Sequence, residues 1–476
     1  MLFSVLGTVA GLALGWAGTR GFLAIAPANL PRVESARIDW RVLLFAAAAG
    51  LVAAAVFGVL PALRAARPDL MHALRSSGHN SRLAGGHWLR SGVVMAEVTL
   101  SFVLLAGSGL MFRTFVALRH VDPGYDPHGL LTCFVTRDWP LTKQAGRLEL
   151  LRQMQTRLAA IPGIRGATAT LALPLAGGPR LKASNATTPR PDAPNAGDAD
   201  MQQVMPDYFE TLRTPLLAGR TFTDADNASG RNLAVVDELF AASAFPGVSP
   251  IGRRIRTPDP DHPSVEIIGV VGHQRLNSLG ERGRATVYFS DGFWGIGVSR
   301  YWILRTDGDP ARFADAVRRE LAKVDRGLVM TKVQTMDAVV AQDQSGTRLS
   351  LFLLTGFAAI GLLLAAVGLY GVLSTAVRQR TAEIGVRVAL GATPAGIFQM
   401  VVGQGLRLTL AGLALGLAAS LALTRLIASM LVGVKAGDPV TLAAMAVVFL
   451  AVAAVASWIP AARAASLDVN EALREE

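Results

Sequence analysis

Long apolar segments are concentrated at the two ends of the chain, and they constrain its fold more than any other feature. Six of them are close to the roughly 20 residues that an α-helix needs to cross the hydrocarbon core of a bilayer. They cover residues 2–25, 42–63, 91–111, 349–376, 401–427 and 441–458. No charged residue lies between Arg348 and Arg378, which makes the fourth segment the clearest. We therefore expect an α-helical transmembrane bundle of six spans.

The overall composition agrees with a membrane protein. Of 476 residues, 51% are hydrophobic and only 17% charged, which is too apolar for a soluble protein of this length. The net charge of +11 could indicate a nucleic-acid partner, but much of the excess lies beside the apolar segments, where basic residues set topology. No basic run interleaved with aromatic residues occurs. We expect the lipid bilayer as a partner and no nucleic acid.

Arginines in two short connections predict the orientation of the spans. One group lies between the second and third spans, and the other lies directly after the fourth. Short loops rich in Lys and Arg face the cytoplasm. With six spans, both termini are then cytoplasmic, and the long segment between the third and fourth spans lies outside. The arginines are Arg64, Arg67, Arg75, Arg82 and Arg90 in the first group, and Arg378, Arg380 and Arg387 in the second.

Two parts of the chain repeat. The segment PALRAARPDLMHALR at residues 61–75 matches PAARAASLDVNEALR at 460–474, and AGLALG at 10–15 recurs identically at 411–416. Each copy has a span, an outer loop, a span and a basic tail in the same order, which indicates an internal duplication. The first copy starts directly inside its penultimate span. We favour a shortened reading frame over a natural six-span protein, and the upstream DNA would decide between them.

The repeated glycines predict close helix packing. Gly11 and Gly15 in the first copy, and Gly412 and Gly416 in the second, place small residues four apart on one helix face, where two helices can approach closely in lipid. Glu97 lies early in the third span. An intramembrane carboxylate is by default a functional candidate, but its closeness to the end of the span favours a structural role, either at the membrane interface or facing the bundle.

The middle of the chain has the periodicity of a mixed α/β domain. A β-rich run at 130–136 precedes a helical pattern that stops at Pro162, and a second strand follows from 164. A similar unit runs from YWILRT through a helix starting near Pro310 to GLVMTKV. Two βαβ units at the two ends of one segment predict a split α/β sandwich whose sheet is completed from both ends. A strand-rich insert containing LAVVDELF and VEIIGVVG lies between them.

Motifs of catalysis are absent from this middle segment. It has no GxSxG elbow, no HExxH and no paired cysteines, since Cys133 is the only cysteine of the chain. The histidines are scattered singly, which is typical of surface or structural side chains. They are His120, His128, His262 and His273. We expect no catalytic, metal or cofactor-binding residues, and a binding surface in place of an active site.

The loop between the fourth and fifth spans, RQRTAEIGVRVALGATPAGIF, predicts a short amphipathic helix. Arg380, Glu383 and Arg387 form a charged stripe, and Ile384 and Val388 form an apolar stripe beside it. Such a helix could rest on lipid. Its mixture of acidic and basic residues favours a protein partner instead.

Several motifs resemble one known family. RTAEIGVRVALGA resembles the cytoplasmic loop of FtsX-domain permeases, and MPDYFETLRTPLLAGRTFTDAD, SPIGRRIR and EIIGVVG resemble the MacB-type periplasmic core domain. ALRHVDPGYDPHGLL and the duplication resemble the duplicated orphan MacB-like permeases. The resemblance covers nearly the whole chain. It departs from the family pattern at His273, where aspartate is common after GVVG, and at the missing front of the first copy.

The resemblance to MacB/FtsX-type ABC transporter permeases implies a domain plan. Residues 1–76 would be the C-terminal half of a first FtsX-like permease domain, and 77–90 a cytoplasmic linker. Residues 91–113 would form a span, 114–347 a MacB-like periplasmic core domain, and 348–476 an FtsX-like permease domain with three spans. The implied location is the bacterial inner membrane, with the large domain in the periplasm.

The resemblance also implies partners. An ABC ATPase subunit would dock at the cytoplasmic face and bind the ATP, because this chain has no GxxxxGK[ST] loop, and a periplasmic or outer-membrane protein would contact the other side. This chain would then be a non-catalytic permease for export. An FtsX-like regulator of a cell-wall hydrolase is the alternative, while the motifs argue against a membrane-anchored enzyme. The implied ATPase-coupling residues are Arg380, Thr381, Glu383, Ile384, Gly385, Arg387, Ala389, Leu390, Gly391 and Ala392.

Overall fold

The structure, a computed structural model, contains two compact units. One unit comprises Met1–Phe112, Thr347–Ser429 and Lys435–Glu476, and the other comprises Arg113–Gly346 and Met430–Val434. The description below is confined to residues 2–25, 39–55, 84–137, 146–176, 180–181, 184–185, 199–229, 231–257, 264–281, 283–294, 297–423, 431–435 and 437–466. The repeated tail segments at 61–75 and 467–474 lie outside these residues, as does His262.

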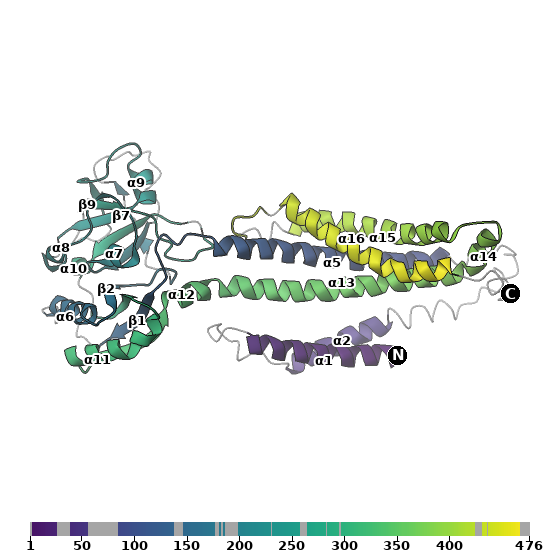
Figure 1. The fold of residues 1–476 in the computed structure, drawn as a ribbon, viewed down its shortest axis with the longest axis horizontal. Helices are drawn as coiled ribbons and strands as arrows, with labels where there is room; N and C mark the ends of the chain where they lie inside the picture. Colours follow the sequence, from purple (N-terminus) through teal and green to yellow (C-terminus); the bar gives the residue numbers. More distant parts are fainter. Residues whose placement is uncertain are drawn as a thin grey trace. The chain divides into compact units, whose positions relative to one another are not determined.

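The first unit is helical (Figure 1). Its helices are α1 (Leu2–Ile25), α2 (Trp40–Ala54), α5 (Ala84–Arg119), α13 (Ser345–Gln379), α14 (Thr381–Ala389), α15 (Pro394–Leu423) and α16 (Pro439–Ala465). In the described part of the chain, four helical segments are long and apolar enough to cross a membrane: Ser91–Arg119, Ser345–Gln379, Pro394–Leu423 and Pro439–Ala465. These match the predicted third to sixth spans. The first predicted span matches α1, and the second overlaps α2 but continues at 56–63, outside the described residues; the total of six is not confirmed.

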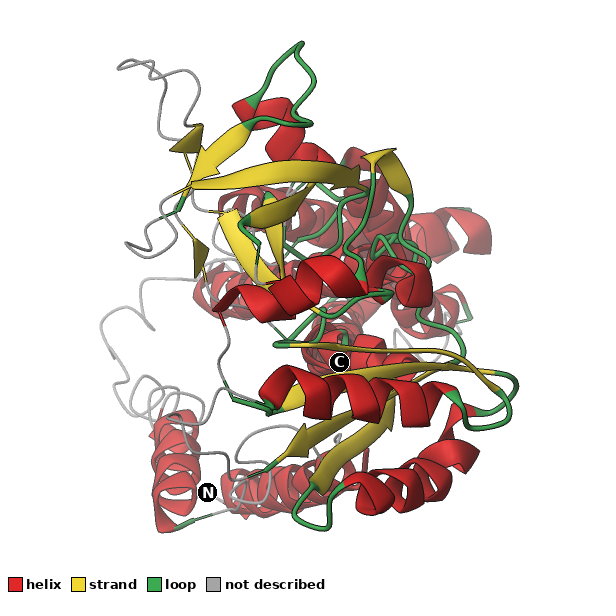
Figure 2. Cartoon of the chain, turned by 90° about the vertical axis from the view of Figure 1, so that its left-hand side faces the viewer, coloured by secondary structure: helices red, strands yellow, loops and turns green. Residues whose placement is uncertain are grey.

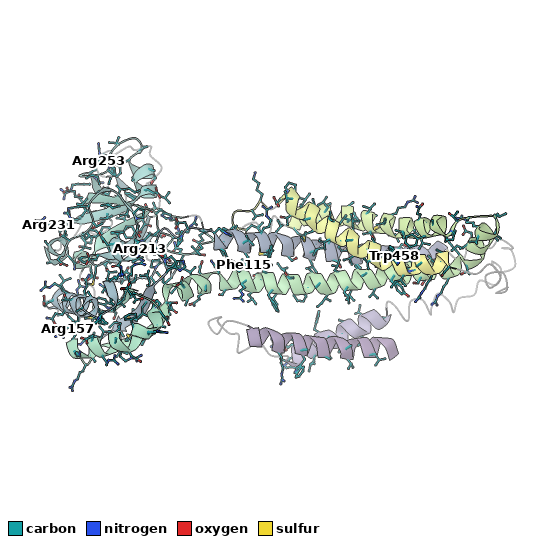
Figure 3. All side chains as sticks on the ribbon, in the orientation of Figure 1. Phe115, Arg157, Arg213, Arg231, Arg253 and Trp458 are labelled. Carbon is teal, nitrogen blue, oxygen red and sulfur yellow. The ribbon has the colours of Figure 1, made fainter. Side chains whose placement is uncertain are left out.

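The bundle of α5, α13, α15 and α16 is held by small and aliphatic side chains. Its buried cluster includes Val98, Phe102, Leu369 and Phe449, each at most 2% exposed. The rings of Phe102 and Phe449 meet edge to face at 6.3 Å. Trp458, labelled in Figure 3, makes a similar contact at 5.4 Å with the ring of Phe398 on α15.

The second unit, Arg113–Gly346 with Met430–Val434, is called the outer unit below. It is built on one mixed sheet, whose strands are yellow in Figure 2. Its main strands are β1 (Leu130–Thr136), β2 (Ile164–Thr170), β5 (Ala199–Val204), β7 (Leu233–Asp237), β9 (Ser264–Val271), β10 (Thr286–Ser290), β11 (Arg300–Thr306) and β12 (Val329–Thr335). Shorter strands are β3 (Arg180–Leu181), β4 (Ser184–Asn185), β6 (Leu216–Gly219) and β8 (Arg254–Arg256). The main order is β12-β1-β11-β2-β5-β10-β7-β9-β8-β4.

Strands from both ends of the outer unit alternate in this sheet. β11 lies between β1 and β2 and runs antiparallel to both, while β12 pairs antiparallel with the free edge of β1. β1 and β2 are therefore the parallel strands of a split βαβ unit. This confirms the predicted completion of the sheet by chain from both ends.

Short helices connect and cover the strands. They are α6 (Arg147–Ala159), α7 (Tyr208–Leu212), α8 (Asp224–Ser229), α9 (Glu238–Ala244), α10 (Asp291–Trp294), the 3-10 helix η3 (Pro310–Phe313), α11 (Ala314–Val324) and α12 (Met336–Asp343). The run LAVVDELF is a strand only as far as Asp237. The Asp237 carboxylate accepts a hydrogen bond from the Phe240 N–H at 2.7 Å, which caps and starts α9.

Candidate functional site

Helix α14 contains the residues predicted to couple to an ATPase. It follows α13 after a one-residue break at Arg380, and the Thr381 hydroxyl lies within hydrogen-bond distance of the Arg378 carbonyl at 3.0 Å. Gly391 ends the helix with a φ of +94°, in the left-handed region that favours glycine. The N–H of Ala392 then donates to the Arg387 carbonyl at 2.9 Å. The break at Arg380 and the turn at Gly391 thus define where α14 begins and where it ends.

The predicted charged stripe lies on the surface of α14. The Arg387 Nη2 donates to Glu383 Oε1 at 2.6 Å, and the Arg380 Nε lies 4.0 Å from Glu383 Oε2. All three side chains are about half exposed. Exposed pairs of this kind stabilise a helix by only about 0.2–0.5 kcal/mol, so the stripe is available for contacts outside the chain.

The apolar stripe of α14 packs against the chain itself. Ile384 is only 1% exposed and belongs to the same buried cluster as Leu373 and Ile397, and Gly385 is buried as well. Val388 is half-buried against that cluster. Ile384 therefore packs in the chain's own buried cluster with residues of α13 and α15, and its part in ATPase coupling stays a prediction.

Two other apolar residues of the loop face outward. Leu390 is 83% exposed and Val386 is 48% exposed. With Glu383 they follow the spacing i, i+3 and i+7, so they lie on the same side of α14 as the charged stripe. Sequence analysis missed Val386, although this spacing contains it. Among the other predicted loop residues, Ala389 and Gly391 are exposed, and Thr381 and Ala392 are partly buried.

The two predicted pairs of packing glycines differ in what surrounds them. A Cβ on Gly412 would lie 2.6 Å from Val98 Cγ1, and one on Gly416 would lie 3.0 Å from Phe102 Cδ1, so both glycines admit α5 closely against α15. A Cβ on Gly11 or Gly15 would meet no described atom within 4 Å. The packing role of the first pair stays a prediction.

Helix α5 approaches α13 in the same way through polar side chains. The Ser101 hydroxyl donates to the Gly361 carbonyl at 2.8 Å. One turn along α5, a Cβ on Gly368 would lie 2.5 Å from Glu97 Oε2. Glu97 therefore contacts the neighbouring helix, which agrees with the expected role facing the bundle.

Single histidines of the outer unit have local partners. His273 is 14% exposed at its side chain, and its Nδ1 lies 2.6 Å from Asp237 Oδ2, at the start of α9. His128 Nδ1 lies 2.9 Å from Asp337 Oδ1 at the surface. Cys133 is fully buried in the sheet, and this burial raises the pKa of its thiol to about 12. Across the described residues, no group of three or more His, Cys, Asp or Glu side chains is placed to hold a metal ion.

Two family models match the chain. The model of the MacB-like periplasmic core domain matches residues 98–341, about half of the chain, and the model of the FtsX-like permease C-terminal domain matches residues 355–469. The first match covers α5 from Val98 onward and nearly all of the outer unit, and the second runs from within α13 to just beyond α16.

Named relatives agree with these matches. The macrolide export ATP-binding/permease protein MacB of Marinobacter nauticus is 25% identical over 81% of this chain, which spans 57% of that protein. The uncharacterized ABC transporter permease YknZ of Bacillus subtilis is 25% identical over 59% of this chain and 70% of its own length. The periplasmic region of MacB from Actinobacillus actinomycetemcomitans aligns with 46% of this chain and 94% of its own, at 15% identity and a TM-score of 0.32. The two family matches, the first of which covers half of the chain, show that the chain belongs to the MacB/FtsX-type family of ABC transporter permeases.

Proposed function

We propose that this chain is the non-catalytic permease subunit of an ABC exporter in the bacterial inner membrane, and that an ATPase subunit docks on α14. The observation that carries the proposal is the outward face of α14. There the Glu383–Arg387 pair lies beside the exposed side chains of Val386 and Leu390. An apolar centre with a polar rim is typical of protein interfaces. The buried Ile384 holds this face in place from behind.

The shape of the long helices supports transmission of motion by rigid elements. α5 has 36 residues and α13 has 35, so at about 1.5 Å per residue each is more than 50 Å long, against about 30 Å of hydrocarbon. The last turn of α5 enters the outer unit, where Leu118 is 2% exposed within the main core. We infer that α5, whose residues belong to both units, carries motion from one to the other.

Tight packing of the spans supports the same view. A cavity between them, lined by Val98, Leu369, Thr409 and Phe449 among others, has a volume of about 10 Å³. That is about the space of one water molecule. We infer that ATP-driven motion passes along the helices to the outer unit, with α14 in the cytoplasm, six spans and the outer unit in the periplasm.

The direction of transport is part of the proposal. The MacB relative is named for macrolide export, which favours export here over FtsX-like control of a cell-wall hydrolase. The substrate class and a periplasmic or outer-membrane partner stay predictions.

Reconstitution with a candidate ABC ATPase tests the docking face. We expect Glu383→Arg and Leu390→Asp each to weaken capture of the ATPase by about tenfold or more, since truncating a central interface contact costs more than about 1 kcal/mol. Leu217→Asp is the matched control, because Leu217 is 53% exposed but lies in the outer unit. ATPase stimulation is measured on the same samples. Unchanged capture and stimulation in both α14 variants would contradict the docking role.

A third variant distinguishes contact from support. Ile384→Ala removes a buried side chain, so we expect it to lower the thermal stability of the permease as well as docking. Leu390→Asp should lower docking alone. Equal losses of stability in the two variants would show that α14 is disrupted as a whole.

A further inference from the structure

Helices α1 and α2 pack on each other as a hairpin, to which nothing above assigns a role. In the sequence repeat, α1 corresponds to α15 and α2 corresponds to α16. The second helix of each hairpin starts in the same way. Asp39 accepts a hydrogen bond from the Val42 N–H at 3.0 Å, and at the corresponding positions Asp438 accepts one from the Thr441 N–H at 2.9 Å.

The two hairpins also share the register in which their helices meet. A Cβ built on Gly50 of α2 would overlap the Thr8 hydroxyl of α1. The repeat sets Gly50 against Phe449 and Thr8 against Thr409, and these two residues line the same small cavity of the bundle. The hairpin of α1 and α2 is therefore a structural copy of the hairpin of α15 and α16.

The face of α15 that packs in the bundle is made of small residues. From its middle onward, the buried residues of this helix are Thr409, Gly412, Gly416 and Ser420. Each has a counterpart of the same kind in α1, either a glycine or a residue with a small hydroxyl side chain. These counterparts are Thr8, Gly11, Gly15 and Thr19. The whole packing face of this part of α15 is thus kept in α1.

In the second hairpin, this face receives α5. Val98 and Phe102 of α5, which lie against Gly412 and Gly416, are at most 1% exposed. The Thr99 hydroxyl donates to the Gly412 carbonyl at 3.1 Å. The contact surface of α5 is therefore two bulky apolar side chains four residues apart, with a hydroxyl directly after the first.

In the first hairpin, the same face is open. Gly11 and Gly15 are exposed, and a Cβ on either would meet no described atom within 4 Å. Glycines four apart on an apolar helix do not by themselves identify a ligand. Here, however, the identical run AGLALG holds a helix at a second place in the same chain, on a hairpin of the same register. This second observation indicates what the open face binds.

The α5 of this chain is already used. Its Val98 and Phe102 are buried against α15, so the side of α5 that fits such a face is occupied. A second copy of the chain would add one more α5 and two more faces of this kind, on its own α1 and α15. Pairing of two copies would therefore leave the same face open.

We propose that the face of α1 formed by Thr8, Gly11, Gly15 and Thr19 binds a transmembrane helix of a partner protein, and that this helix has the contact surface of α5. Small residues let two helices approach closely in lipid, where packing and interhelical hydrogen bonds hold them together. A Thr or Ser hydroxyl of the partner would donate to the Gly11 carbonyl. The inference goes beyond the docking of an ATPase and does not depend on it.

A synthetic α5 peptide tests this face on the full chain. The peptide has the sequence of residues 88–113 and carries an acceptor dye, and the chain carries a donor dye at its amino terminus. Both are placed in phosphatidylcholine vesicles, and energy transfer during a titration with the peptide gives an apparent Kd. We expect Gly11→Leu and Gly15→Leu each to raise this Kd by about tenfold or more, because a leucine side chain keeps the two helices apart.

Matched controls place the same kind of change on another face. Ala17 is exposed and lies about 200° around α1 from Gly15, so Ala17→Leu should leave the Kd unchanged. In the peptide, Phe102→Ala should raise the Kd by about tenfold, whereas Leu100→Ala should not, since Leu100 is 66% exposed on α5. A wild-type chain that gives no saturable energy transfer would overturn the proposal. Equal weakening by Gly11→Leu and Ala17→Leu would overturn it as well.

The chain without peptide shows whether a second copy covers the face instead. We expect no dimer that depends on Gly11, measured by cross-linking in the same vesicles. Dimers of the wild-type chain that Gly11→Leu dissociates would assign the face to a second copy and refute a partner helix. No ATPase is present in these samples, so a failure of ATPase docking would leave all of these results unchanged.

Discussion

Replacement of Asp291 by Asn tests how the core of the outer unit is held together. Asp291 is 1% exposed, and its two oxygens accept hydrogen bonds from Arg147 Nη1 at 2.7 Å and from Arg300 Nε at 2.6 Å. Both arginines are 2% exposed. This one carboxylate therefore joins α6 to β11 through α10.

The expected cost follows from burial. Asn keeps the shape of Asp291 but removes its charge, so two buried guanidinium groups lose their shared carboxylate. Breaking a buried ion pair on one side costs about 3–5 kcal/mol. In a domain of about 150–250 residues, 1 kcal/mol shifts the unfolding midpoint by about 2–4 °C. We expect Asp291→Asn to lower the midpoint of the outer unit by about 6–20 °C.

Hydrogen exchange measured by mass spectrometry on the full chain gives a local readout. Amides of β1, β2 and β11 should exchange faster in Asp291→Asn, because these strands open with the outer core. The control is Asp315→Asn, which breaks an exposed pair with Arg318 and should cost about 0–1 kcal/mol. If Asp291→Asn shifted the midpoint no more than this control, the buried charge cluster would not be a determinant of stability.

Three further predictions concern helix packing in the membrane unit, the buried cysteine of the outer unit and the topology of the chain. Gly412→Leu should destabilise the bundle, because the new side chain would clash with α5. Gly403→Leu on the same helix should not, since a Cβ at Gly403 meets no described atom within 4 Å. Thermal unfolding in detergent compares the two variants. The wild-type chain should resist an impermeant maleimide at neutral pH, because the Cys133 thiol is buried and its pKa is raised to about 12. In whole cells, Ser184→Cys should be labelled and Ser77→Cys should not, and the reverse pattern would refute the proposed orientation.

Local patterns in the sequence were enough to predict most of the elements. An uncharged apolar run identifies α13 because the bilayer requires about 20 such residues whatever the neighbours are. Likewise, β1 follows from the β-rich run LLTCFVT, and β2 from its place directly after the helix stop at Pro162 and Gly163. The split sheet was also predictable, because two similar units at the two ends of a segment have few ways to share one sheet.

The orientation of side chains was decided only in the tertiary structure. Helical spacing places Ile384 on one face of α14 and Leu390 on another, but it does not say which face the chain itself covers. The same holds for Asp291, whose two arginine partners lie far from each other in the sequence. Sequence periodicity predicts which residues lie on the same face of a helix or strand. Only the packing of segments that are distant in the sequence determines what that face contacts.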